Sequence, residues 1–135
     1  MRGRFQEVVL MCGIAGILNS RAADPTHLVS EMIGAMRYRG PDDSGAWGDA
    51  TVGLGLGHAR LSILDLSPEG HQPMVSASGR YVITFNGEVY NFAEMRCELE
   101  ADGARFRGHS DTEVMLAAIE RWGLIEAVSR FVGMF

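Results

Sequence analysis

Short apolar segments, interrupted at irregular intervals by turn-forming residues, are the feature of this sequence that most constrains its fold. Residues 13–18 alternate small and apolar side chains as a buried strand would, and residues 81–85 are rich in β-branched and aromatic side chains. The predicted order is strand, helix, several strands, helix, strand, helix, which lacks the regular alternation of a doubly wound parallel sheet. We therefore expect an α+β fold with mainly antiparallel strands.

Capping residues indicate where two of the three predicted helices begin. Asp24 followed by Pro25 is typical of an N-cap and a first helical position, and this helix should end near Arg37. Ser-Asp-Thr-Glu at residues 110–113 has the form of a capping box that opens the last helix. The apolar faces of the helices would contain Leu28, Met32 and Met36, then Phe92, Met95 and Leu99 before Gly103, then Met115, Leu116 and Ile119.

Glycine and proline divide the middle of the chain. Residues 39–45 combine Gly, Pro, Asp and Ser and are predicted to form a loop. Residues 51–66 contain apolar stretches broken by glycines, which favours two short strands with bulges or close backbone contacts. Residues 73–75 and 81–85 flank a turn at 76–79 and are predicted to pair as a hairpin.

The composition is that of a folded globular domain, and it excludes several functions. The 135 residues are 47% hydrophobic and 21% charged, which is ordinary for one domain. The net charge is −5 and all 12 basic residues are Arg, without the basic patch of a nucleic-acid-binding protein. No apolar run is long enough for a signal peptide or a membrane span. Two cysteines make neither a disulfide framework nor a zinc site, so the expected location is a reducing cytoplasm.

Four separated segments contain residues suited to chemistry, although each is weak evidence by itself. A free cysteine usually behaves as a small buried hydrophobe, and Asn-Gly is a strong hairpin signal. Together, their order and spacing are hard to match by chance. The segments are Cys-Gly-Ile-Ala-Gly at residues 12–16, Arg-Gly-Pro-Asp at 39–42, His-Ala-Arg-Leu-Ser-Ile at 58–63 and Phe-Asn-Gly-Glu-Val-Tyr-Asn at 85–91.

With Ser-Asp-Thr-Glu at residues 110–113, this set resembles the class II glutamine amidotransferases of the N-terminal-nucleophile hydrolase superfamily. The resemblance covers residues 11–135. Within that class, residues 39–45, 60–65 and 70–74 are most similar to glutamine-dependent asparagine synthetases. The resemblance implies an αββα sandwich of mainly antiparallel sheets, of which this chain would hold the N-terminal part and lack the last strands.

The resemblance also implies that Cys12 is a nucleophile and that its own free α-amino group is the catalytic base. A cysteine thiol is mostly protonated near neutral pH, so it needs a neighbouring base before it can attack an amide. An α-amino group titrates near neutral pH, and it can accept the thiol proton and return it to departing ammonia. The mature chain should therefore begin at Cys12.

Attack on the side-chain amide of glutamine creates an oxyanion, which needs hydrogen-bond donors placed in advance. By resemblance, the side-chain amide of Asn86 and the backbone N–H of Gly87 form this oxyanion hole. The alternative interpretation of the same two residues is a hairpin turn with no catalytic role.

Free glutamine also carries an α-carboxylate and an α-ammonium group. Arg60 corresponds to the carboxylate ligand of the family, because a guanidinium binds a carboxylate through two parallel hydrogen bonds. Asp111 corresponds to the ammonium ligand with Glu88 nearby, and the backbone at Leu61 and Ile63 would contact the substrate. The alternatives are a surface charge for Arg60, an interaction with the helix dipole for Asp111 and a solvated strand-end charge for Glu88.

The other reactive residues have simpler explanations. Cys97 lies in a predicted helix without a partner motif and is expected to be a structural thiol. His58 is expected to be a packed histidine. The remaining histidines, His27, His71 and His109, lack the spacing of metal ligands, so we expect no metal and no cofactor in this domain.

Ten residues precede Met11, whereas the nucleophiles of the family lie at the mature N-terminus. Residues 1–11 are explained by a misassigned translation start, by a propeptide or by an extension that blocks activity, and we favour the first. Residues 12–135 would then form a partial amidotransferase domain. As written, the chain would lack its catalytic base. The open sheet edges of a truncated sandwich would favour a homodimer.

The predicted function is hydrolysis of glutamine to glutamate and ammonia through a cysteinyl thioester, with the ammonia passed to a synthetase domain that makes asparagine from aspartate. ATP and Mg²⁺ would serve only that domain, because the sequence has no phosphate-binding loop of the GxxxxGK[ST] type. The alternatives are another nitrogen acceptor, a silent glutamine-binding or assembly module, and an N-terminal-cysteine hydrolase of a different amide. The charges of Arg60 and Asp111 favour glutamine over the last of these.

Overall fold

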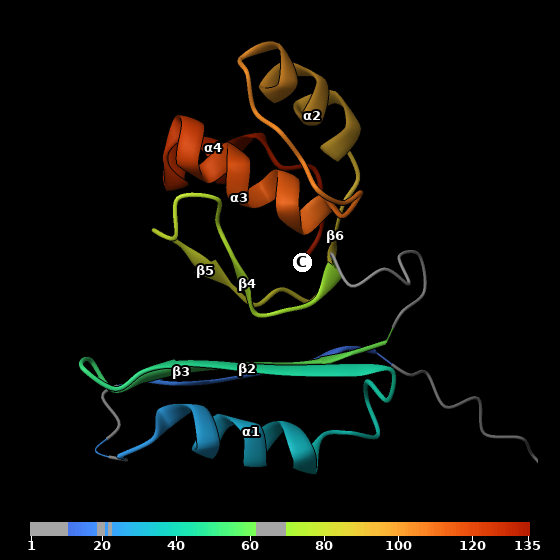
Figure 1. Cartoon of the computed structure of the whole chain (residues 1–135). Helices are drawn as coiled ribbons and strands as arrows, with labels where there is room; N and C mark the ends of the chain where they lie inside the picture. The colour runs from blue at the N-terminus through green and yellow to red at the C-terminus, as the bar shows by residue number, and fades with distance from the viewer. Residues whose placement is uncertain (1–10, 19–20, 22, 62–69) are drawn as a thin grey trace, which may run out of the picture.

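The computed structural model describes residues 11–18, 21, 23–61 and 70–135, and it confirms an α+β fold with antiparallel strands (Figure 1). The elements in chain order are β1 (Gly13–Ile17), α1 (Pro25–Ala35), β2 (Asp43–Asp49), β3 (Leu54–Arg60), β4 (Met74–Val75), β5 (Val82–Ile83), β6 (Glu88–Val89), α2 (Phe92–Ala101), α3 (Asp111–Trp122), α4 (Leu124–Arg130) and β7 (Gly133–Met134).

A three-stranded antiparallel sheet in the order β1-β3-β2 forms the base of the site. Figure 1 shows α1 against one face of this sheet, with the β4–β5 hairpin and the other three helices on the opposite side. Side chains alternate between the two faces of a strand. Ala59 therefore faces α1 and packs with Val29 and Ile33, whereas His58 and Arg60 point toward the hairpin side.

Glycine in the central strand lets α1 approach closely. A Cβ atom at Gly57 would lie 2.5 Å from side-chain carbons of both Val29 and Ile33, closer than real carbon contacts allow. The apolar side chains of α1 therefore pack directly against the backbone of β3, which brings the helix close to the sheet.

A second core lies among α2, α3 and α4. Leu99, Val114 and Ala118 are fully buried there, and Val89 of β6 joins them. Half-buried aromatic residues of the hairpin region pack against this core from the sheet side. The turn of the hairpin is tied to α3, because the N–H of Ser78 donates to Glu120 at 3.0 Å and the Ser78 hydroxyl donates to the same carboxylate.

The predicted helix starts are confirmed. Asp24 accepts a hydrogen bond from the N–H of His27 at 3.0 Å, and Ser110 accepts one from the N–H of Glu113 at 3.2 Å. The Glu113 carboxylate accepts from the backbone N–H groups of Arg107 at 2.8 Å and Gly108 at 2.9 Å, and so ties the preceding loop to α3. The first helix ends at Ala35, slightly before the predicted end. Its predicted apolar face was wrong, because the helix buries Val29 and Ile33 whereas Met32 is exposed.

The strand predictions need four corrections. The predicted order places a strand between the second and third helices, but residues 102–110 between α2 and α3 form turns and bends and contain no strand. Residues 39–45 were predicted to be a loop, but residues 43–45 belong to β2 because their backbone pairs with β3 despite their turn-forming side chains. Gly45 serves close packing, since a Cβ there would lie 2.2 Å from the carbonyl oxygen of Gln72. Within 51–61 there is one strand, β3, and residues 62–66 lie outside the described part. The β4–β5 hairpin is confirmed but shorter than predicted.

Helix α4 and the β6–β7 pair were not predicted. The pairing of Glu88 with Met134 and of Val89 with Gly133 joins segments that are far apart in the sequence, so no local pattern announces it. Within the described residues, the structure contains no helix that is both long enough and apolar enough to cross a membrane.

Replacement of Gly57 by Ala tests the close packing of α1. The added methyl would collide with Val29 and Ile33, so we expect the free energy of unfolding to fall by about 1–3 kcal/mol in chemical denaturation. Gly34→Ala is the matched control: no atom lies within 4 Å of its Cβ position, and the change should stabilise α1 by up to about 1 kcal/mol. Equal effects of the two substitutions would contradict this packing.

Candidate active site

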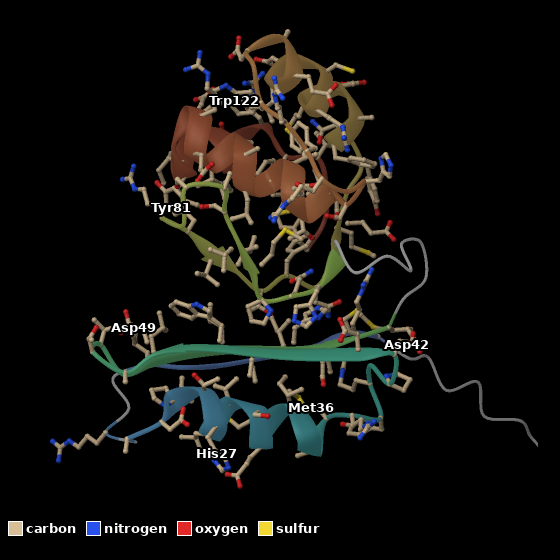
Figure 2. All side chains as sticks on the ribbon, viewed as in Figure 1. His27, Met36, Asp42, Asp49, Tyr81 and Trp122 are labelled. Carbon is tan, nitrogen blue, oxygen red and sulfur yellow. The ribbon has the colours of Figure 1, made fainter. Side chains whose placement is uncertain are left out.

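Cys12 lies immediately before β1, at the end of the sheet where β3 finishes. The register pairs Gly13 with Ala59 and so brings Cys12 beside Leu61. The backbone N–H of Leu61 donates to the Cys12 Sγ at 3.3 Å, and the Sγ also lies 3.6 Å from the Leu61 carbonyl oxygen. Asp42 is at this end of β2 and Asp49 is at the other (Figure 2). The half-buried thiol is thus held by backbone groups.

The side chain of Asn86 reaches the same residue from the other side of the site. Its Nδ2 donates to the Cys12 carbonyl oxygen at 3.2 Å, and the Nε of Arg39 donates to that oxygen at 3.4 Å. Asn86 and Cys12 are 74 positions apart in the sequence. The fold therefore brings together two residues that the sequence assigned to one reaction.

Gly87 occupies a place where no side chain fits. A Cβ there would lie 2.4 Å from the Met134 carbonyl oxygen and 2.8 Å from the Phe85 ring. Gly87 is not among the glycines with positive φ, and the strands on its two sides do not pair with each other, because β5 pairs with β4 and β6 with β7. The alternative interpretation of Asn86-Gly87 as a hairpin turn is therefore wrong.

Arg60 is the last residue of β3 and lies on the hairpin side of the sheet. Its guanidinium packs against Gly70, where a Cβ would be 2.3 Å from a guanidinium nitrogen. Its backbone carbonyl accepts from the N–H of Asp42 at 3.1 Å, and its chain neighbour Leu61 contacts the thiol. Arg60 is half-buried, which is more enclosed than a simple surface charge.

Asp111 lies at the start of α3 and is fixed against the segment that carries Asn86 and Gly87. Its Oδ2 accepts from the backbone N–H of Val89 at 2.9 Å, and its Oδ1 accepts from the Thr112 hydroxyl at 3.3 Å. A carboxylate there also interacts favourably with the helix dipole.

The two remaining predicted contacts are Glu88 and Ile63. Glu88 is exposed at the start of β6, as its alternative interpretation expects. Ile63 lies outside the described residues.

Two buried polar residues near the site, Gln72 and Thr112, were not expected from the sequence. Gln72 is 8% exposed; its Oε1 accepts from the N–H of Phe85 at 2.6 Å, and its Nε2 donates to the Thr112 hydroxyl at 3.4 Å. The only sequence signal was the position of Gln72 in the segment that resembles asparagine synthetases. Gln72 thus bonds to the chain neighbour of Asn86, and Thr112 bonds to Gln72.

Comparison with known proteins decides the family. A model described as "Glutamine amidotransferase domain" matches residues 11–135. The chain belongs to the glutamine amidotransferase domain family. It is 43% identical over 129 residues to "Asparagine synthetase [glutamine-hydrolyzing] 1" of Bacillus subtilis (strain 168), a match that covers 93% of this chain and 20% of that protein.

Other relatives of the amidotransferase domain have related names. "Putative asparagine synthetase [glutamine-hydrolyzing]" of Mycobacterium tuberculosis (strain ATCC 25618 / H37Rv) is 39% identical over 140 residues, which cover 93% of this chain and 21% of that protein. "Amidase chry2" of Gibberella zeae is 35% identical over 125 residues, which cover 84% of this chain and 18% of that protein. The chain thus spans about a fifth of the length of these curated relatives.

His58 is a packed histidine of the amidotransferase domain, as expected. It also bonds to Phe85, the residue before Asn86. It is 2% exposed, its Nε2 lies 3.2 Å from the Phe85 carbonyl oxygen, and its Nδ1 has no partner among the described residues. Burial lowers the pKa of His58, and the bond to Phe85 only partly opposes this. The imidazole is therefore neutral near pH 7 and donates from Nε2.

The remaining candidates lie away from the thiol. Cys97 is an exposed free thiol of α2. His71 lies 2.7 Å from a carboxylate oxygen of Asp43. Within the described ranges, no group of three or more His, Cys, Asp or Glu residues could hold a metal ion. A cavity of about 240 Å³ lies on the other face of the sheet, between α1 and β2, and is separate from this site.

The buried histidine makes stability depend on pH. Because its native pKa lies below the value of about 6.5 for an unfolded histidine, the unfolded chain binds more protons and stability falls as pH decreases below that value. In His58→Gln the amide nitrogen can still donate to Phe85, but this titration is absent. We expect the melting temperature of His58→Gln to fall less between pH 7 and pH 5 than that of the unmodified chain.

The exposed His27 of α1 supplies the control for this experiment, because His27→Gln should retain the full pH dependence. If the His27 and His58 variants lose stability in parallel with the unmodified chain, the burial of a neutral imidazole at position 58 is not the cause.

Proposed function

We propose that this chain, in a form that begins at Cys12, hydrolyses the side-chain amide of glutamine with the thiol of that residue. The free α-amine of Cys12 takes the thiol proton, and the sulfur attacks the amide carbon to form a tetrahedral oxyanion. The C–N bond then breaks, the leaving nitrogen takes the proton and departs as ammonia, and a glutamyl thioester remains. Water hydrolyses the thioester to glutamate and the free thiol. The net reaction consumes one water and releases one ammonia for each glutamine.

The contact between Asn86 and Cys12 is the observation that carries this proposal. The Asn86 amide lies within hydrogen-bond distance of the residue that supplies the sulfur, and the Leu61 N–H lies against the sulfur itself. A donor that close to the nucleophile is placed to meet the oxyanion after a modest rotation of its side chain. The Gly87 N–H would be the second donor. No metal or cofactor is assigned a role in these steps.

Recognition of the two charged groups of glutamine is assigned to Arg60 and Asp111. The placement of Arg60 next to Leu61 supports its role as carboxylate ligand. Asp111 is supported as the ammonium ligand by its bond to Val89, close to the Asn86-Gly87 segment. Glu88 and the backbone of Leu61 and Ile63 would complete the pocket.

In the complete protein, we propose, the ammonia serves the synthesis of asparagine from aspartate. Relatives named as glutamine-hydrolysing asparagine synthetases support this acceptor. ATP and Mg²⁺ would be bound by a synthetase domain, and no residue of this chain is assigned to them. The reaction would take place in the cytoplasm, where a reducing environment keeps the thiol free.

The finer fold assignment is an N-terminal-nucleophile αββα sandwich. The order of layers in Figure 1, with helices outside and strands between them, supports it. We also propose a homodimer, because β1 and β2 are the edge strands of the three-stranded sheet and an edge strand can pair with a second copy.

A second candidate is the same glutaminase chemistry with a different nitrogen acceptor. The match to the protein named "Amidase chry2" favours it, because the name of that relative refers to no asparagine synthesis. Ammonia transfer to aspartate by the complete protein distinguishes the two acceptors, and glutamine hydrolysis by this chain is common to both.

The catalytic role of the free α-amine of Cys12 can be tested by comparing two forms of the chain. In the 135-residue form the nitrogen of Cys12 is part of a peptide bond with Met11, so this form should not release glutamate. A form that begins at Cys12 should release glutamate and ammonia, and Cys12→Ala in that form should abolish the reaction. Glutamate release and intact mass are measured, and circular dichroism checks that both forms fold.

Cys97→Ala is the matched control in the form that begins at Cys12. This free thiol is exposed on α2, away from the site, so its removal should leave glutamate release unchanged. Equal activity of a demonstrably uncleaved 135-residue chain would contradict the role given to the amine. Glutamine binding without turnover by the shorter form would favour the silent module.

Replacement of Asn86 by Ala tests the oxyanion hole. Loss of one such donor typically lowers kcat by about 10²–10³, and KM for glutamine should change much less because the charged ends of the substrate are bound elsewhere. Steady-state kinetics of the form that begins at Cys12 measure both constants, and thermal unfolding excludes misfolding. A kcat within a few-fold of the unmodified value would contradict the assignment.

A further inference from the structure

A continuous series of hydrogen bonds through three side chains connects the first residue of the segment from Phe85 to Val89 with its last residue. The N–H of Phe85 donates to Gln72 at 2.6 Å, and Gln72 donates to Thr112 at 3.4 Å. Thr112 donates to Asp111 at 3.3 Å, and Asp111 accepts from the N–H of Val89 at 2.9 Å. The residues between these ends, 86–88, include both proposed oxyanion donors.

The chemistry of the groups fixes the direction of each bond. A backbone N–H can only donate, so the carbonyl oxygen of the Gln72 amide must face Phe85 and the NH₂ must face Thr112. The Thr112 hydroxyl accepts from that NH₂, which leaves its single proton for the Asp111 carboxylate. Because a backbone N–H, which can only donate, fixes one end and a carboxylate, which can only accept, fixes the other, only one arrangement satisfies the series.

Because the groups are buried, breaking any of these hydrogen bonds costs free energy. Gln72 is 8% exposed and Thr112 is 3% exposed, so water cannot readily replace a lost partner. Two of the roughly four acceptor positions of the Asp111 carboxylate are used by Val89 and Thr112, and the others remain for a ligand. Thr112 therefore orients Asp111, and Gln72 orients both Thr112 and Phe85.

We propose that Gln72 and Thr112 are positioning residues that couple the oxyanion hole to the subsite for the α-ammonium group of glutamine. The proposal rests on the proposed glutaminase function and extends it to two neutral residues that need not touch the substrate. Gln72 acts at both ends of the segment, through Phe85 and through Thr112. Thr112 bonds directly to Asp111 and reaches Phe85 only through Gln72.

Two substrates separate these roles. Glutaramate has the side-chain amide and carboxylate of glutamine but lacks the α-ammonium group. Thr112→Val keeps the shape of the side chain and removes its hydroxyl, and in the form that begins at Cys12 it should lower kcat/KM for glutamine about tenfold. For glutaramate the same variant should lose less, about twofold, because no ammonium group needs Asp111 and only the indirect effect through Gln72 on Phe85 remains. Thr112→Ser retains the hydroxyl and should restore the value for glutamine.

Gln72→Met should behave differently, because Gln72 also holds Phe85 beside Asn86. We expect kcat to fall about tenfold for both substrates, with an additional rise in KM for glutamine alone. Thr84→Val is the matched control: Thr84 adjoins Phe85, but its hydroxyl donates to the Gly57 carbonyl oxygen at 3.1 Å. Any effect of this control should be equal for the two substrates.

Hydrogen exchange of the 135-residue chain tests the coupling without activity. The Phe85 amide should exchange faster in Thr112→Val, although Thr112 does not bond to Phe85. Equal losses with both substrates in Thr112→Val, unchanged kinetics in Gln72→Met, or unchanged exchange at Phe85 would each overturn the coupling. Failure of the unmodified Cys12-first form to hydrolyse glutamine would instead overturn the glutaminase proposal, and with it the catalytic meaning of the coupling.

Discussion

The antiparallel pairing of β1 with β3 is the constraint on which the rest of the structure depends. Its register places Gly13 opposite Ala59 and therefore brings Cys12 beside Leu61. A shift of β3 by one residue would turn Ala59 away from α1 and direct His58 into the helix interface, because the side chains of a strand alternate between its faces. One pairing thus determines both the core beneath α1 and the position of the thiol.

The segment from Phe85 to Val89 joins this sheet to the helical side of the molecule. Toward the sheet, His58 contacts the Phe85 carbonyl and Asn86 reaches the residue with the thiol. Toward the helices, the N–H of Val89 bonds to Asp111 at the start of α3. The proposed oxyanion donors are therefore carried by a backbone segment that both layers hold, which would preorganise them without a rigid helix or strand.

Local signals predicted where α1 and α3 begin, because a cap such as Asp24 or Ser110 acts within one turn of its helix. Helix α4, whose N-cap makes no side-chain hydrogen bond, was not predicted. Local signals also failed for β2 and for β6–β7, whose strands are defined by partners elsewhere in the chain. The family resemblance assigned Cys12 and Asn86 to one reaction, and the two residues are in contact in the structure. Gln72 was missed because its proposed positioning role depends on contact with Thr112, 40 positions away, and a neutral amide is not a typical catalytic group.

In the proposed reaction, the two charges of glutamine are bound by different layers, with Arg60 at the end of β3 and Asp111 at the start of α3. A substrate that binds both would bridge the layers. Binding energy at its charged end can lower the barrier at its amide only if the layers keep a fixed separation. In this proposal the buried side chain of Gln72 bears on catalysis because its amide oxygen and its amide nitrogen are both hydrogen-bonded, which fixes its orientation. An apolar side chain of similar size would let the layers shift.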